Sequence, residues 1–130
     1  MSNSEHLKLL TGGTKGWNAW RAANPRVPVD LSGARLRGVN LQGVDFFGVN
    51  LRGADATGAN LSHSRLDAAD LRSATLDGAV LRNSSMFAKL DGMSLVRADL
   101  QEAFLPGTAL MGVHLEQANL IRANLAELLL

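Results

Sequence analysis

The residues with the greatest chemical potential lie close together at Ser62, His63, Ser64 and Asp67. A serine, a histidine and an aspartate can form a hydrolytic triad, in which the histidine removes the proton of the serine hydroxyl. Here, however, their spacing is that of a five-residue repeat that runs through the surrounding chain. The repeat turns Ser64 inward and places His63 at a corner, so we interpret His63 as a solvated side chain.

The other candidate sites for chemistry are incomplete. The segment Gly12-Gly13-Thr14-Lys15 contains glycines and a lysine but lacks the rest of a phosphate-binding loop. Asp67 and Asp77 fall on outward positions of a convex surface, which offers no cleft to hold a substrate. The chain has no cysteine, which excludes disulfides and thiolate-bound metals. The sequence therefore predicts no catalytic, cofactor-binding or metal-binding residues, and we expect that the protein is not an enzyme.

A large apolar residue recurs at every fifth position from Leu31 to Leu130, with one interval of four residues between Met86 and Leu90. Five residues advance about 140° around a helix axis, so a helix would scatter these side chains over all its faces. On a straight strand, successive centres would face opposite ways. One interior can hold them all only if the chain turns a corner every five residues, as in a solenoid. The predicted structural core comprises Leu31, Leu36, Leu41, Phe46, Leu51, Leu61, Leu66, Leu71, Leu76, Leu81, Met86, Leu90, Leu95, Leu100, Leu105, Leu110, Leu115, Leu120 and Leu125.

The neighbouring positions of the repeat agree with this geometry. The residue two before each centre is small, as at Ala34 and Val39, and it shares the inward face because residues two apart on an extended segment point the same way. The residue two after the centre is often glycine, as at Gly33, which predicts a corner with positive φ. The remaining positions are mostly Asn, Asp and Arg, and we expect them to face water.

Several of the repeats resemble the A-[DN]-L-x-x unit of the pentapeptide-repeat family. The clearest units are Ala54-Asp55-Ala56, Ala59-Asn60-Leu61, Ala69-Asp70-Leu71, Ala98-Asp99-Leu100, Ala118-Asn119-Leu120 and Ala123-Asn124-Leu125. This resemblance covers residues 29–130 and implies an all-β solenoid, a right-handed quadrilateral β-helix with four pentapeptides in each of about five coils.

Residues 1–28 differ in kind and predict a short N-terminal α-helical cap. Ser4 is a candidate N-cap for a first helix that breaks at Gly12-Gly13, and a second short helix carries Trp17 and Trp20 before Pro25 ends it. This lead-in is similar to the W-N-x-W-R-x-x-N-P segment of many bacterial family members. We interpret the tryptophans as a cover for the first coil, with a partner-binding aromatic pair as the alternative.

Two irregularities of the repeat carry structural predictions. The four-residue interval predicts a tight or irregular corner at Phe87–Lys89, with a continuous interior through it. Phe46 is large for its column and Ala56 is small, and the two centres occupy opposite walls. We expect Phe46 to fill space that a leucine at position 56 would otherwise take.

Length and charge limit the possible functions. The 130 residues suit a single domain, and the net charge is +1. With no apolar run long enough to span a membrane and no signal-like N-terminus, we expect a cytoplasmic protein.

The favoured function is a rigid scaffold or protein-interaction module. One alternative is the gyrase-binding, quinolone-protection branch of the family, which mimics DNA with acidic faces. Here Arg52 and Arg72 stack on one face, and arginines such as Arg65 interrupt the acids elsewhere. A second alternative, direct nucleic-acid binding, lacks a basic stripe.

Apolar residues collect toward the end of the sequence at outward positions. The candidate partner surface comprises Phe104, Pro106, Met111, Ile121, Leu128, Leu129 and Leu130. An apolar cluster beside a β edge predicts association, and we expect a homodimer through the C-terminal coils. The alternative is that Leu128–Leu130 fold over the last coil as a lid.

Overall fold

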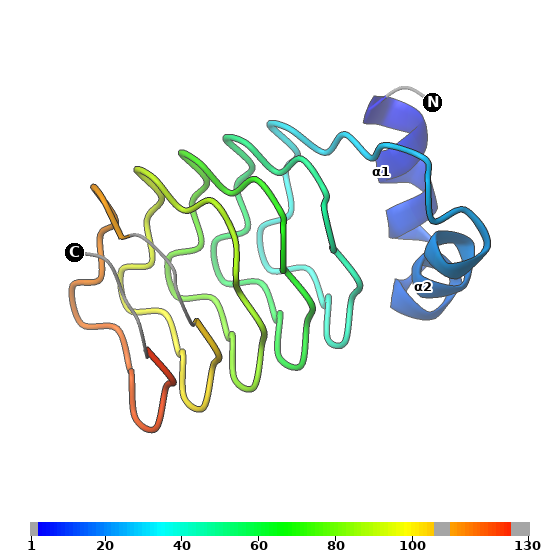
Figure 1. Cartoon of the computed structure of the whole chain (residues 1–130). Helices are drawn as coiled ribbons and strands as arrows, with labels where there is room; N and C mark the ends of the chain where they lie inside the picture. The colour runs from blue at the N-terminus through cyan, green and yellow to red at the C-terminus, as the bar shows by residue number, and fades with distance from the viewer. Residues whose placement is uncertain (1–2, 106–109, 126–130) are drawn as a thin grey trace.

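The computed structural model describes residues 3–105 and 110–125 of the chain. Two helices, α1 (Asn3–Thr11) and α2 (Thr14–Ala23), lie at one end of the molecule, and beyond them the chain winds in stacked coils (Figure 1). The β structure of these coils consists of isolated parallel bridges, each a single residue pair, rather than of longer strands.

The bridges between successive coils set the register of the rod. Asp30 pairs with Asn50, and Arg65 pairs with Ser85, so one coil takes 20 residues. Within one coil, four residues spaced five apart form such bridges, so each coil has four sides. Residues that pair from coil to coil on one side form a ladder. The ladders are Asp30, Asn50, Asp70 and Lys89 on the first side; Arg35, Asp55, Thr75, Ser94 and His114 on the second; Asn40, Asn60, Val80, Asp99 and Asn119 on the third; and Asp45, Arg65, Ser85, Phe104 and Asn124 on the fourth.

Backbone hydrogen bonds between coils follow this register. The Leu31 amide donates to the Asn50 carbonyl at 2.7 Å, and the Asn50 amide donates back to the Val29 carbonyl at 3.0 Å. At the corners the residue two after the centre has positive φ, as predicted, with values of 67° at Gly33 and 56° at His63. Apart from its two chain neighbours, no described residue would lie within 4 Å of a Cβ added at Gly33, so the backbone conformation rather than a lack of space favours glycine there.

A local hydrogen bond explains why Asn and Asp precede so many of the apolar centres. The Asp30 side chain accepts from the Ser32 amide at 2.9 Å, and the Asn60 side chain accepts from the Ser62 amide at 3.1 Å. These are Asx turns, in which a short polar side chain satisfies the backbone two residues further on. The sequence predicts only that this column faces water, so its role in the corners is a finding of the structure.

At two corners, the acceptor for this backbone amide is an aspartate of the preceding coil. Where serine replaces Asn or Asp at Ser85, the Asp67 carboxylate accepts from the Ser85 hydroxyl at 2.7 Å and from the Phe87 amide at 2.9 Å. At Ser94, the Asp77 carboxylate likewise accepts from the Ser94 hydroxyl and from the Val96 amide, the latter at 3.1 Å. Each carboxylate therefore joins two coils.

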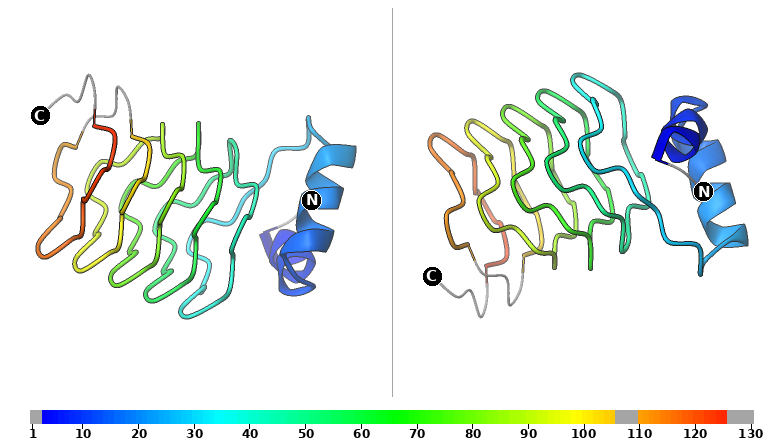
Figure 2. Two further views of the ribbon diagram at one scale, coloured as in Figure 1. Left: turned by 90° about the horizontal axis from the view of Figure 1, so that it is seen from below. Right: turned by 90° about the horizontal axis from the view of Figure 1, so that it is seen from above.

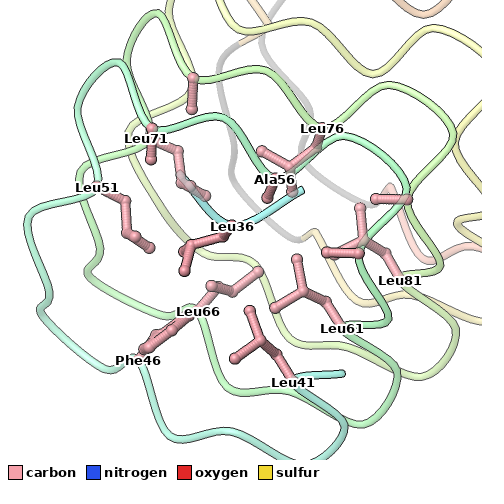
Figure 3. Packing of buried hydrophobic residues seen from close by; sticks show 14 of the residues in the cluster. Leu36, Leu41, Phe46, Leu51, Ala56, Leu61, Leu66, Leu71, Leu76 and Leu81 are labelled. Atoms are coloured by element: carbon pink, nitrogen blue, oxygen red, sulfur yellow. The ribbon is translucent and has the colours of Figure 1, made fainter. Parts of the chain in front are cut away.

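Apolar side chains fill the interior of the coils (Figure 3). The predicted core residues from Leu31 to Leu105 are buried, whereas Leu110, Leu115, Leu120 and Leu125 are only partly buried. The expectation for Val39 is wrong, since this side chain is 39% exposed. Val39 lies in the first coil between the two segments that bond to the helices, at residues 30–32 and 43–47, whereas Val29 and Val44 in the same column are buried.

Phe46 and Ala56 lie on opposite walls of the interior, as the repeat predicts (Figure 3). Both line an apolar cavity of only about 10 Å³. A cavity of this size holds at most about one water-sized probe, so the packing around Ala56 is nearly complete.

The short interval in the repeat produces the predicted irregular corner. Phe87 and Ala88 do not form the two-residue turn of the other corners. The register nevertheless continues, because the Ala68 amide donates to the Phe87 carbonyl at 2.7 Å and the Leu71 amide donates to the Lys89 carbonyl at 2.8 Å. Residues that pair across this corner are 19 rather than 20 positions apart in the sequence, as are Asp70 and Lys89.

The two helices pack against the first coil (Figure 2). Trp17 is fully buried, its Nε1 donates to the Asp45 carbonyl at 2.9 Å, and its ring meets Phe46 edge-on at a centroid distance of 5.8 Å. His6 is also buried, and its Nδ1 accepts from the Asp30 amide at 3.1 Å. None of the described helices is long and apolar enough to cross a membrane.

The helix boundaries differ from the prediction at both N-terminal ends. The first helix already includes Asn3, so Ser4 lies in its first turn and is not the N-cap. The second helix begins at Thr14, well before Trp17, because Gly13 with its φ of 108° leaves the chain free to restart immediately. It ends at Ala23, as the following Asn24-Pro25 predicts.

Candidate interaction surface

The residues that suggested a catalytic triad are separated by the fold. Ser64 is buried, His63 is exposed at a corner, and the Asp67 carboxylate is bonded to Ser85. The Ser62 hydroxyl donates to the Asn60 side chain at 2.7 Å. Within the described residues, no group of three or more His, Asp or Glu side chains could hold a metal ion.

The predicted C-terminal partner surface is only partly described and does not form one patch. Pro106, Leu128, Leu129 and Leu130 lie outside the described residues. Met111 is 75% exposed at the corner that follows the first side, whereas Ile121 is 58% exposed at the corner that follows the third side. These two corners are diagonally opposite in a four-sided coil, so Met111 and Ile121 share the end of the described rod rather than one of its sides.

The fourth side instead brings together three exposed phenylalanines that are far apart in the sequence. Phe104 belongs to the fourth ladder, and Phe47 and Phe87 each follow a residue of that ladder by two positions. Their exposed fractions are 41% for Phe47, 56% for Phe87 and 45% for Phe104. We call Phe47, Phe87 and Phe104 the aromatic side. The five-residue pattern does not bring these residues together, because they belong to three different coils.

Charged groups lie among these rings. The Arg65 guanidinium carbon is 4.3 Å from the centroid of the Phe47 ring, a cation–π contact. One Arg65 nitrogen is 3.9 Å from a carboxylate oxygen of Asp45. Both Asp45 and Asp67 use carboxylate oxygens to accept backbone hydrogen bonds, from the Phe47 and Phe87 amides.

A groove of about 200 Å³ adjoins the helical end of the aromatic side. The segment that links α2 to the first coil forms one wall, and Phe47 and Gly48 form the other. The Arg21 guanidinium reaches across and donates to the Phe47 carbonyl. The lining residues are Arg21, Pro25, Arg26, Val27, Pro28, Val29, Phe47 and Gly48.

Carboxylates elsewhere on the rod are held ionised by their neighbours. Bonds from the Arg72 side chain lower the pKa of Asp70, the Thr57 hydroxyl lowers the pKa of Asp55, and the Ser32 amide lowers the pKa of Asp30. Several acids pair with arginines, including Asp55 with Arg37 at 3.1 Å and Glu102 with Arg122 at 3.3 Å. Acidic and basic groups are therefore interspersed.

Comparisons with known proteins agree with the repeat geometry. The sequence matches the model of a family described as pentapeptide repeats over residues 29–62, 45–83 and 87–117. A comparison with curated proteins gives no significant match.

Among solved structures, the chain is similar to HetL, a pentapeptide repeat protein involved in heterocyst differentiation regulation in the cyanobacterium Nostoc sp. strain PCC 7120. The two share 32% identity with a TM-score of 0.62, over 76% of this chain and 58% of HetL. A pentapeptide repeat protein of the Arabidopsis thaliana thylakoid lumen has 28% identity and a TM-score of 0.52, over 60% of this chain and 62% of that one. QnrB1, a plasmid-mediated fluoroquinolone resistance protein, has 18% identity and a TM-score of 0.51, over 73% and 54% of the two chains, which shows a common fold alone. The chain thus spans about three fifths of the length of HetL and of the Arabidopsis protein.

Proposed function

This chain belongs to the pentapeptide-repeat family, whose members form right-handed quadrilateral β-helices, and we propose that it acts as a rigid, non-enzymatic scaffold that binds another protein through its outer surface. The observation that carries this proposal is the continuous backbone register, which passes even through the irregular corner at Phe87–Lys89. It fixes the backbone of each outward residue in the described coils at a defined position along the rod and on a defined side. A surface ordered in advance loses little conformational entropy on binding.

The finer organisation is part of the same proposal. Residues 1–28 act as the helical cap, and residues 29–130 form one β-helix of about five coils that completes a single domain. The burial of Trp17 and its bond to Asp45 support the capping role, because they cover the first coil. The cytoplasmic location expected from the sequence stays a prediction, and fractionation of the source cell would test it.

A homodimer through the C-terminal coils also belongs to the proposal. The partly buried Leu110, Leu115 and Leu120 and the exposed Met111 and Ile121 support it, since apolar surface at one end of a rod favours self-association. Light scattering at micromolar concentration tests it. We expect a dimer that Met111→Asp and Ile121→Asp convert to monomer, and a wild-type monomer that neither substitution changes would contradict this.

The scaffold role is tested by affinity capture from the source cell together with a gyrase supercoiling assay. We expect a stoichiometric protein partner and no inhibition of gyrase. The pairing of acidic groups with arginines supports this ranking over DNA mimicry, which needs charge of one sign along the rod. Inhibition of gyrase at near-stoichiometric concentration would replace the general scaffold with the gyrase-binding function.

A further inference from the structure

We infer that the aromatic side and its adjoining groove form a docking site for an extended, acidic peptide segment that carries apolar side chains. This inference rests on the proposed interaction role, and it names the surface and the chemistry of the partner. Its occupant is a segment of a partner protein.

The apolar part of the site has the dimensions of a short extended peptide. Phe47 and Phe104 are three coils apart, which is about 14 Å at about 4.8 Å per coil. Phe87 lies between them along the rod. At about 3.3 Å per residue, four or five residues of an extended chain span this distance. Alternate side chains of such a peptide point to the same face, so they can reach successive rings.

The groove extends the site at the helical end and is already formed. Pro25 and Pro28 restrict the backbone of its wall, since the pyrrolidine ring fixes φ. Phe47 is common to the groove and to the aromatic side, so the two surfaces are continuous. A peptide can therefore pass from Phe47 directly into the groove, whereas between Phe47 and Phe87 it passes the corner of Asp67.

The charges of this surface favour an acidic occupant. Arg21, Arg26 and Arg65 supply three guanidinium groups, whereas Asp45 and Asp67 supply two carboxylates. Both carboxylates already accept hydrogen bonds from backbone amides, which consumes part of their capacity. Arg26 is exposed and makes no ion pair with any residue that the structure describes. Carboxylates of a bound peptide can pair with these arginines.

The same charges disfavour a nucleic acid, although exposed rings beside arginines can also stack on bases. Asp45 and Asp67 lie on the path that a phosphate backbone would take along this side. A peptide can place its few carboxylates opposite the arginines and its apolar side chains elsewhere, whereas a nucleic acid carries a charge at every nucleotide.

Fluorescence anisotropy with three labelled probes tests the inference. The first is a peptide of about eight residues that alternates aspartate with leucine and phenylalanine, long enough to cover the rings and the groove. The second has lysine in place of each aspartate, and the third is an oligothymidine of similar length. We expect saturable binding of the acidic peptide alone. Phe87→Ser should weaken it by about tenfold, as for a central interface residue. Val39→Ser, a change at an exposed apolar residue outside the aromatic side, the groove and the proposed dimer surface, is the matched control and should leave binding unchanged.

A charge reversal separates specific docking from general stickiness. Arg26→Glu should weaken the acidic peptide several-fold and strengthen the lysine peptide, with far-UV circular dichroism confirming that the variant is folded. Preferred binding of oligothymidine, binding that Phe87→Ser and Arg26→Glu leave unchanged, or no binding of the acidic peptide would each overturn the inference. In those cases a captured partner that still binds both variants would leave the scaffold proposal standing, whereas a failure to capture any partner would remove both.

Discussion

The substitution Ala56→Leu distinguishes a closely packed interior from one with a usable hole. The change adds three carbon atoms to a buried side chain. If space were free, burying these carbons would stabilise the fold by about 2 kcal/mol, at about 0.8 kcal/mol for each. The cavity beside Ala56, however, is about 10 Å³, which is too small for three carbons. We therefore expect overpacking, and the free energy of unfolding should fall by about 1–3 kcal/mol.

The double variant Phe46→Leu/Ala56→Leu locates the origin of this loss. Phe46 lines the same cavity from the opposite wall, so shortening it releases space that Leu at position 56 can occupy (Figure 3). Phe46→Leu alone should destabilise, partly because the ring also packs against Trp17. The two changes should be strongly non-additive, with a coupling of about 1 kcal/mol or more in favour of the double variant.

Equilibrium unfolding in urea measures all four proteins of this cycle. Trp17 and Trp20 lie in the second helix, so tryptophan fluorescence reports on the cap, whereas far-UV circular dichroism also reports on the coils. Coincident transitions from the two probes justify a two-state fit, which repeat proteins do not always satisfy. A gain in stability for Ala56→Leu, or additive effects in the cycle, would refute the reasoning that Phe46 fills the space opposite Ala56.

Three further predictions concern buried hydroxyls, corners and acid sensitivity. The Ser84 hydroxyl is buried and has no hydrogen-bond partner among the described residues. Ser84→Ala should therefore raise the free energy of unfolding by about 1 kcal/mol in urea melts. A lower free energy of unfolding would indicate a hydrogen bond that the structure does not show. Ala68 has a φ of 61°, which glycine adopts at lower steric cost than alanine. Ala68→Gly should therefore stabilise the fold by about 1 kcal/mol after the entropy cost of glycine. Its control is Ala69→Gly in the buried inward column, which should destabilise the fold. The pKa of Asp55 lies below the ordinary value of about 3.9, so its ionised form stabilises the fold above that pH and this contribution disappears as the pH falls through the lowered pKa. Asp55→Asn keeps a side-chain acceptor for the corner, as Asn40 and Asn60 do. The urea midpoint of this variant should depend less on pH below about 4 than that of the wild type. An unchanged pH dependence would show that other carboxylates cause the acid sensitivity.

The sequence predicts the interior of this molecule well because one requirement acts on every repeat. Each centre such as Leu61 must be apolar to be buried, and each corner residue such as Gly33 must tolerate positive φ. These two requirements repeat every five residues, so they are visible without knowing how the coils stack. The same reasoning predicts the irregular corner after Met86, where the count of residues fails.

The arrangement of the outer surface depends on a longer period and could not be obtained from the five-residue pattern alone. Met111 and Ile121 are close in the sequence but lie at opposite corners, whereas Phe47 and Phe87 are two whole coils apart and lie above one another. Aligning the sequence in rows of 20 residues, with 19 across the irregular corner, would have shown the aromatic side. The groove could not be found this way, because it depends on how the segment after α2 passes the first coil.

The carboxylates of Asp67 and Asp77 give the rod a preferred direction of assembly. Corners such as those at Ser32 and Ser62 take their side-chain acceptor from their own coil, but those at Phe87 and Val96 take it from the coil that precedes them in the chain. Neither corner can be completed until that earlier coil is in place. During synthesis the earlier coil emerges from the ribosome first, and domains begin to form from the N-terminus. The helices and first coils can therefore act as a template onto which later coils are added one at a time, so that growth proceeds from the capped end.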